Sequence, residues 1–210
     1  MGVSARGEAA RFRRRRLSGQ GIVWLGAAAL LLTAGSLRAQ ELVRLDPART
    51  TIGFTLGATM HTVHGAFKLK SGEIRFNPAT GKASGAIVVD ATSGNTENGS
   101  RDKKMHRDVL ESSKYSEIVF RPERVEGTLA AEGTSEVKVA GLLWLHGQDH
   151  AVALDLKVER SAGGDLTVST KFPVPFVSWG LKDPSSFLLR VDKIVNVEVH
   201  AAGRMERAAP

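Results

Sequence analysis

The sequence of 210 residues contains no cysteine. Disulfide bonds are therefore excluded, and so is the cysteine acylation that anchors bacterial lipoproteins. The Gly-x-Ser-x-Gly turn of many hydrolases is also missing, as is a phosphate-binding loop for nucleotides. These absences argue against hydrolases and nucleotide-binding enzymes that use these two motifs, but they leave open a catalytic triad scattered along the chain.

The first 39 residues have the layout of a secretory signal peptide. Five arginines between Arg11 and Arg16 precede an apolar run at residues 22–34, and small residues follow up to Ala39. The run has 13 residues, whereas a helix needs roughly 20 to span a bilayer. We therefore predict cleavage after Ala39, which places the protein in the periplasm or outside the cell without a permanent membrane anchor. A retained anchor is the alternative.

Removal of this leader changes the charge balance. The whole sequence carries 29 Lys and Arg against 22 Asp and Glu, a net charge of +7. The leader holds seven of the arginines and one glutamate, so the rest of the chain has a net charge of +1. Nucleic-acid binding needs a concentrated positive surface. We therefore expect no nucleic-acid partner.

Apolar and polar residues alternate through most of residues 40–203, which we expect to form one domain. Alternation with a period of two is typical of strands that bury one face. The expected strands lie near residues 52–56, 63–69, 74–76, 86–89, 118–122, 137–145, 152–158, 166–174 and 187–200. Short turns join them, so the pattern predicts an all-β chain of about eight strands, as a sandwich or a barrel. Residues 204–210 read as a flexible tail.

Residues 101–120 begin with a helical pattern that breaks this rhythm. Met105, Val109 and Leu110 form a narrow apolar stripe, and Ser100 is a suitable N-cap. Mixed charges on the same segment are typical of a solvated helix face rather than a binding patch. The pattern predicts one short helix whose apolar stripe packs over the sheet.

Two histidine pairs have spacings that raise the question of a metal site. His61 and His64 are three apart within a strand pattern, so their side chains should point to opposite faces. His146 and His150 flank a turn and could approach each other, but the sequence offers no cysteine and no third ligand nearby. We predict that both pairs are ordinary strand and turn residues, and we expect no metal site.

Several motifs occur in the order that is found in the YceI-like, polyisoprenoid-binding family of secreted bacterial proteins. They lie at residues 52–67, 72–81, 101–120, 139–147 and 176–185. The sequence resembles this family over nearly all of the chain after the leader. It departs from the family pattern at Ser116, where proline is usual, and near Ala58, where the first hairpin is shorter and lacks a histidine that many members carry.

The resemblance implies a lipocalin-like antiparallel β-barrel whose apolar tunnel holds a long isoprenoid chain. It implies non-enzymatic binding of an amphiphilic lipid, either an isoprenoid or an isoprenoid quinone, with no other cofactor. The residues expected to contact the lipid are Phe54, Leu56, Phe67, Val88, Met105, Val109, Leu110, Phe120, Leu145, Phe172, Phe176 and Trp179. The alternatives are a small hydrolase or isomerase in the same barrel, and a scaffold whose inward residues form a solid core. The oligomeric state stays open between monomer and homodimer.

Overall fold

The computed structural model describes residues 40–207 apart from Met60 and Leu188, so the predicted leader lies outside the described residues. This part of the chain contains nine strands. They are β1 (Glu41–Leu45), β2 (Thr51–Gly57), β3 (Thr62–Phe76), β4 (Ala83–Asn95), β5 (Glu117–Glu126), β6 (Gly133–Leu145), β7 (Gln148–Arg160), β8 (Asp165–Val174) and β9 (Val195–Arg207). A 3-10 turn, η1 (Pro47–Arg49), separates the first two strands.

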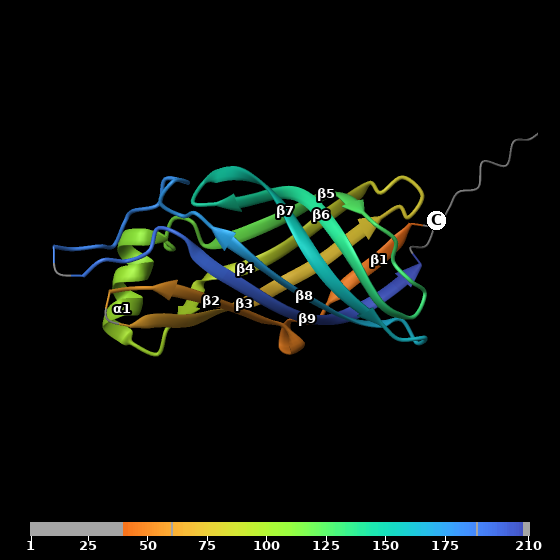
Figure 1. Ribbon diagram of the computed structural model, residues 1–210, viewed down its shortest axis with the longest axis horizontal. Helices are drawn as coiled ribbons and strands as arrows, with labels where there is room; N and C mark the ends of the chain where they lie inside the picture. Colours follow the sequence, from red (N-terminus) through yellow and green to blue (C-terminus); the bar gives the residue numbers. More distant parts are fainter. Residues whose placement is uncertain (1–39, 60, 188, 208–210) are drawn as a thin grey trace, which may run out of the picture. The chain divides into compact units, whose positions relative to one another are not determined.

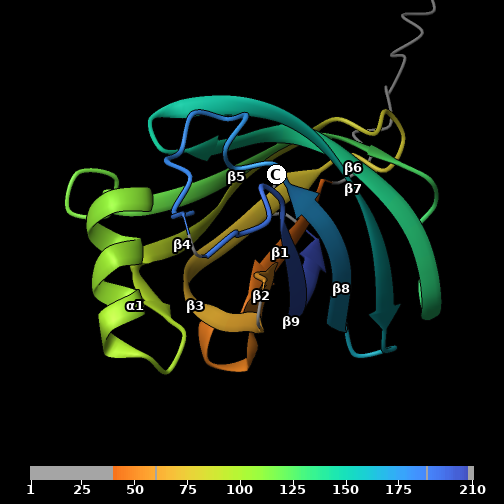
Figure 2. The ribbon, with the colours of Figure 1, turned by 60° about the vertical axis from the view of Figure 1, so that its left-hand side comes forward.

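Strands β2 to β9 close into an eight-stranded antiparallel barrel (Figures 1 and 2). Each strand pairs with the next in the order β2-β9-β8-β7-β6-β5-β4-β3, and β3 returns to β2. β1 is an extra strand that pairs with β3 and β9 beyond the end of β2, so β1 and β2 lie end to end between the same two strands. Closure removes exposed strand edges. The predicted barrel with one short helix is confirmed.

Three strand boundaries differ from the sequence-based expectation. β1 was not predicted. β5 runs on through Pro122 because a bulge follows this residue, and a bulge tolerates the missing N–H of proline. The last strand begins at Val195, since residues 175–194 form a loop, and it continues to Arg207, which pairs with Glu41. Residues 204–207 therefore belong to the barrel and not to a flexible tail.

The predicted helix is shorter than its motif and begins earlier. α1 (Gly99–Lys104) runs directly into one π-helical turn, η2 (Met105–Val109). The Asn98 side chain caps α1 by accepting a hydrogen bond from the Arg101 N–H at 3.0 Å. The N-cap is therefore Asn98 and not Ser100. The helix lies at one end of the barrel, which we call the mouth; the base is the opposite end, where β1 pairs with β9 (Figure 1).

Buried apolar side chains gather in three clusters within the described residues. The central cluster is Phe120, Val137, Val139, Leu143, Leu154 and Val158. The mouth cluster is Leu145, Val174, Phe176 and Leu181. The base cluster is Phe76, Leu166 and Met205. Because residues 41–207 supply every member, this part of the chain has a core of its own and forms one folding unit.

Adjacent strand pairs close the barrel wall to different extents. β6 and β7 pair along their whole length, from Gly133 with Arg160 to Leu145 with Gln148. β7 and β8 pair only between Lys157–Arg160 and Leu166–Ser169. Past this ladder the Thr170 hydroxyl donates to the Asp155 carbonyl at 2.8 Å. Near the mouth, where β7 and β8 are not paired, Trp179 of the 175–194 loop stacks on His150 of β7.

Candidate functional site: an apolar cavity inside the barrel

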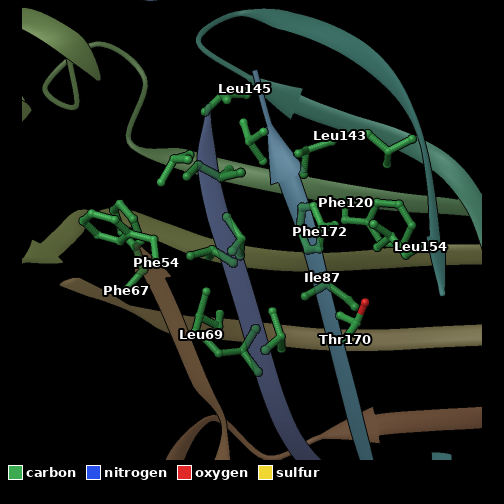
Figure 3. A pocket seen from close by; sticks show the side chains of 18 of the residues that line it. Phe54, Phe67, Leu69, Ile87, Phe120, Leu143, Leu145, Leu154, Thr170 and Phe172 are labelled. Carbon is green, nitrogen blue, oxygen red and sulfur yellow. The ribbon is translucent and has the colours of Figure 1, made fainter. Parts of the chain in front are cut away.

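The inward side chains of the barrel leave a cavity of about 430 Å³. Successive residues of a strand point to opposite faces, so alternate residues of each barrel strand reach it, as Val152, Leu154 and Leu156 do from β7. Figure 3 shows Phe120, Phe172 and Leu154 directed toward this common space. The cavity falls in the size range of small-molecule sites. The interior is therefore not a solid core.

Most of the predicted contact residues line this cavity. They are Phe54, Leu56, Phe67, Met105, Val109, Leu110, Phe120, Leu145, Phe172 and Phe176. They come from β2, β3, η2, β5, β6 and β8, and from the turn after β8. The set therefore surrounds the cavity and includes the helical residues over its mouth.

Val88 and Trp179 do not line the cavity, which corrects their predicted positions. In β4 the neighbours Ile87 and Val89 face inward, so Val88 faces the outer side of the wall. The segment around it is apolar on both faces, and periodicity could not choose between them. Trp179 follows the end of β8 and stacks on His150, with ring centroids 4.1 Å apart and planes inclined by 5°.

Two glycines make room for the aromatic residues near the mouth. The rings of Phe54 and Phe67 lie 5.4 Å apart. A Cβ atom on Gly65 would come within 2.3 Å of the Phe54 ring, and one on Gly94 would come within 2.6 Å of Phe67 and 2.9 Å of the Met105 methyl. A side chain at either position would therefore displace a residue that lines the cavity.

The helical segment is fixed over the mouth by apolar and polar contacts. Val109 and Leu110 pack against the mouth cluster. His106 bridges the helix to β4, since its Nε2 lies 2.8 Å from the Gly94 carbonyl and its Nδ1 lies 2.9 Å from the Ser112 hydroxyl. A carbonyl can only accept, so Nε2 carries the proton and donates. Met105, Val109 and Leu110, which we call the lid residues, are thus held against the cavity.

A buried polar network stands at the mouth of the cavity, whose lining is otherwise mostly apolar. Thr96 is 5% exposed, and its hydroxyl donates to the Asp102 carboxylate at 2.5 Å. The Arg101 guanidinium donates to the Thr96 hydroxyl and carbonyl, both at 2.7 Å. Thr96, Arg101 and Lys104 all line the cavity. The prediction of a solvated charged face is therefore wrong for Arg101 and Asp102. Helical periodicity could not find them, because their partner lies at the end of β4.

The four histidines of the two predicted pairs occupy different surroundings. His61 lines the cavity, whereas His64 is exposed and lies 3.3 Å from the Thr55 hydroxyl, so the two do face opposite ways. His146 donates to Glu111 at 2.7 Å, and His150 stacks on Trp179. Across the described residues no group of three His, Cys, Asp or Glu side chains is placed to hold a metal ion. The helices in this part of the chain are too short or too polar to cross a bilayer.

Fold and cavity together define the class of protein. A closed antiparallel barrel of eight strands around an apolar cavity is a lipocalin-like barrel, a size that holds one small ligand. The model of the YceI-like domain family matches residues 44–202. The chain belongs to this family, which confirms the resemblance of its motifs.

Solved structures of distant relatives share the fold. A polyisoprenoid binding domain from Saccharophagus degradans is 18% identical with a TM-score of 0.60, over 78% of this chain and 98% of that chain. BcnA of Burkholderia cenocepacia is 15% identical with a TM-score of 0.61, over 75% and 98%. A YCEI protein of Campylobacter jejuni is 23% identical with a TM-score of 0.51, over 69% and 86%. No curated protein matches the chain.

Proposed function

We propose that the protein binds an isoprenoid-type lipid, an isoprenoid or an isoprenoid quinone, and sequesters or carries it without chemical change. The observation that carries this proposal is the apolar cavity that reaches from the base residues Phe76 and Met205 to the lid residues at the mouth. A hydrocarbon chain inside it would be surrounded by apolar side chains along the barrel. The affinity would grow by about 0.8 kcal/mol for each CH₂ group buried.

The dimensions of the wall support a long ligand. β6 and β7 each contain 13 residues, and a strand rises about 3.3 Å per residue, so each extends for about 40 Å along its own direction. A protein of similar fold, the polyisoprenoid binding domain from Saccharophagus degradans, points to the same chemical class. Its name describes binding, which supports a role without catalysis.

The rival proposal, a small hydrolase or isomerase, has less support. A hydroxyl nucleophile needs a neighbouring base to accept its proton. The Thr96 hydroxyl of the cavity does donate to a carboxylate, Asp102, but its oxygen also accepts a hydrogen bond from the Arg101 guanidinium. A positive charge beside that oxygen lowers its nucleophilicity, and the network reads better as a structural element of the mouth.

Native mass spectrometry of the purified protein tests lipid binding. Two variants at neighbouring positions serve as the test and its matched control. Ile87→Trp projects a large side chain into the cavity, whereas Val88→Trp adds the same side chain on the outer face. We expect a co-purifying lipid in the wild type and in Val88→Trp, and a loss of about tenfold or more in Ile87→Trp, since a filled cavity excludes the chain. A wild-type protein that never takes up an isoprenoid would refute the proposal.

We also propose that the protein acts in the periplasm or outside the cell after removal of residues 1–39. The support is the sequence of this segment, which has a basic cluster, a short apolar run and small residues before Gln40. Sequencing the N-terminus of the protein from fractionated cells provides the test. A mature chain that begins at Gln40 in the soluble fraction is the expected result, and an uncleaved chain in the membrane fraction contradicts it.

A further inference from the structure

The loop at residues 175–194 presents apolar side chains to water at the mouth of the barrel. Phe187 is 95% exposed, and Leu189 is 36% exposed. The same loop forms part of the cavity wall, because Pro184, Leu189 and Val191 line the cavity. It lies beside the helix, since the Lys104 ammonium donates to the Pro184 carbonyl at 3.3 Å. Figure 1 shows this loop, drawn in blue between β8 and β9, at the same end as α1.

Hydrogen bonds hold this loop in its outward position. The Thr59 N–H donates to the Arg190 carbonyl at 3.0 Å, and the Arg190 N–H donates to the Thr59 hydroxyl at 3.0 Å. The Ser186 N–H donates to the Leu189 carbonyl at 2.8 Å. Val191 also forms a bridge with Ala58. An exposed aromatic side chain is unfavourable in water. A hydrogen-bonded turn that keeps Phe187 extended therefore points to a surface that this side chain meets.

The exposed charges around Phe187 are mostly positive. Lys104, Lys182, Arg190 and Lys193 are exposed. One of the two acidic residues in the loop, Asp183, is half-buried and accepts from the Ser185 N–H at 2.9 Å. Ser185 and the cations Lys193 and Arg190 hold the pKa of Asp183 below its usual range. The exposed acid in the loop is Asp192.

We define the mouth surface as Phe187, Leu189, Lys104, Lys182, Arg190 and Lys193. We propose that this surface docks on a bilayer of anionic phospholipid. Phe187 and Leu189 enter the boundary between headgroups and acyl chains, and the four cations contact lipid phosphates. Aromatic side chains combined with cations are the composition that such a boundary binds. Because Leu189 belongs to both the mouth surface and the cavity wall, docking turns the opening of the cavity toward the membrane.

Vesicle flotation with the chain from Gln40 to Pro210 tests docking, since residues 41–207 form the folding unit described above. The vesicles are phosphatidylcholine with or without phosphatidylglycerol. We expect the wild type to float with the anionic vesicles. Phe187→Ser should reduce the bound fraction about tenfold, as expected for the loss of one buried aromatic side chain. Phe187→Trp should retain binding.

Charge variants test the electrostatic part of the docking. Lys182→Glu combined with Lys193→Glu should weaken binding to the anionic vesicles by more than about tenfold, since each cation near such a surface contributes a severalfold effect. Arg49→Glu, on η1 in the side wall, is the matched control and should leave binding unchanged. Thermal melting of each variant shows that the barrel is intact.

Four outcomes would overturn the docking proposal. They are a wild type that stays in solution with anionic vesicles, equal flotation of Phe187→Ser, an equal loss in Arg49→Glu, and equal binding to neutral vesicles. Ile87→Trp, whose cavity is blocked, should still float. If it does not, vesicle binding arises from lipid extraction into the cavity and not from the mouth surface. This variant separates a failure of docking from a failure of the proposed lipid binding.

Discussion

The base and the mouth of the barrel are built from the same strands but are closed in different ways. At the base, Phe76, Leu166 and Met205 form a buried apolar cluster, and β1 adds backbone pairs with β3 and β9. At the mouth, a short helix and a loop replace strand pairing, and the Thr96 network brings charge to the cavity. The base is thus closed by a packed apolar cluster and paired strands, whereas the mouth is closed by a helix and a loop that backbone bonds to Gly57 and Thr59 hold in place.

The largest expected effect tests the base. Leu166 is 3% exposed, and Leu166→Ala should lower the free energy of unfolding by about 3 kcal/mol, because it removes buried surface and leaves a cavity. Leu189→Ala at the mouth should cost less than about 1 kcal/mol, since Leu189 is 36% exposed and so buries less surface than Leu166. Urea unfolding followed by circular dichroism measures both. Equal losses would remove the proposed difference in stability between the two ends.

A second prediction concerns the polar network of the mouth. Thr96→Val removes the hydroxyl that joins the half-buried Asp102 carboxylate to the Arg101 guanidinium, while the backbone N–H and carbonyl of residue 96 keep one bond to each. We expect a loss of about 2 kcal/mol, since an unsatisfied polar group is costly when buried. The exposed strand residue Thr167 provides the control, and Thr167→Val should change stability by less than about 0.5 kcal/mol. A harmless Thr96→Val would show that water satisfies both charges and that the network is incidental.

A third prediction separates the apolar and charged sides of the helix. Met105→Asp or Leu110→Asp should reduce lipid retention about tenfold, because each places a charge where an apolar side chain lines the cavity. Reversal of the exposed Lys103 and Lys104 should have a smaller effect. The fraction of lipid that remains after dilution, measured by native mass spectrometry, gives the comparison. Equal effects from the two changes would mean that the lid residues do not enclose the ligand.

A fourth prediction uses two glycines with opposite surroundings. An alanine at Gly94 would press its Cβ against Phe67 and Met105, so Gly94→Ala should destabilise the protein by about 1 kcal/mol. At Gly53 the nearest atoms lie 3.8 Å away, and Gly53→Ala should stabilise the strand by about 0.5 kcal/mol. Thermal melting distinguishes the signs. A stabilising Gly94→Ala would show that the lid residues yield without cost.

The smallest expected effect is the pH dependence of the loop at the mouth. The Ser185 hydroxyl and N–H hold the pKa of Asp183 below its usual range. The folded state therefore binds this proton less readily than the unfolded state. The stabilisation is complete above the unfolded-state pKa and is lost as the pH falls through the folded-state pKa, that is, below about pH 4. Asp183→Asn should remove this part of the acid sensitivity in melting curves between neutral and acidic pH.

Much of the barrel and its lining could be predicted because alternation is a local property. Where apolar and polar residues strictly alternate, as at Val152, Leu154 and Leu156, the pattern fixes which side chains face inward. The same rule failed at Val88, where both faces are apolar. It also predicted a strand at residues 187–194 from Leu189 and Val191, although the loop there is held by Thr59, far away in sequence.

The sequence by itself determined the all-β composition, most of the inward residues and the position of one helix, because each depends on neighbours within a few positions. Only the tertiary structure decided that the sheet closes on itself, that β1 lies end to end with β2 between β3 and β9, and that the interior stays open. It also decided that Arg101 and Asp102 turn toward Thr96 instead of water. These features depend on how strands far apart in sequence pack around a common axis, and no local pattern encodes the width of the space between them.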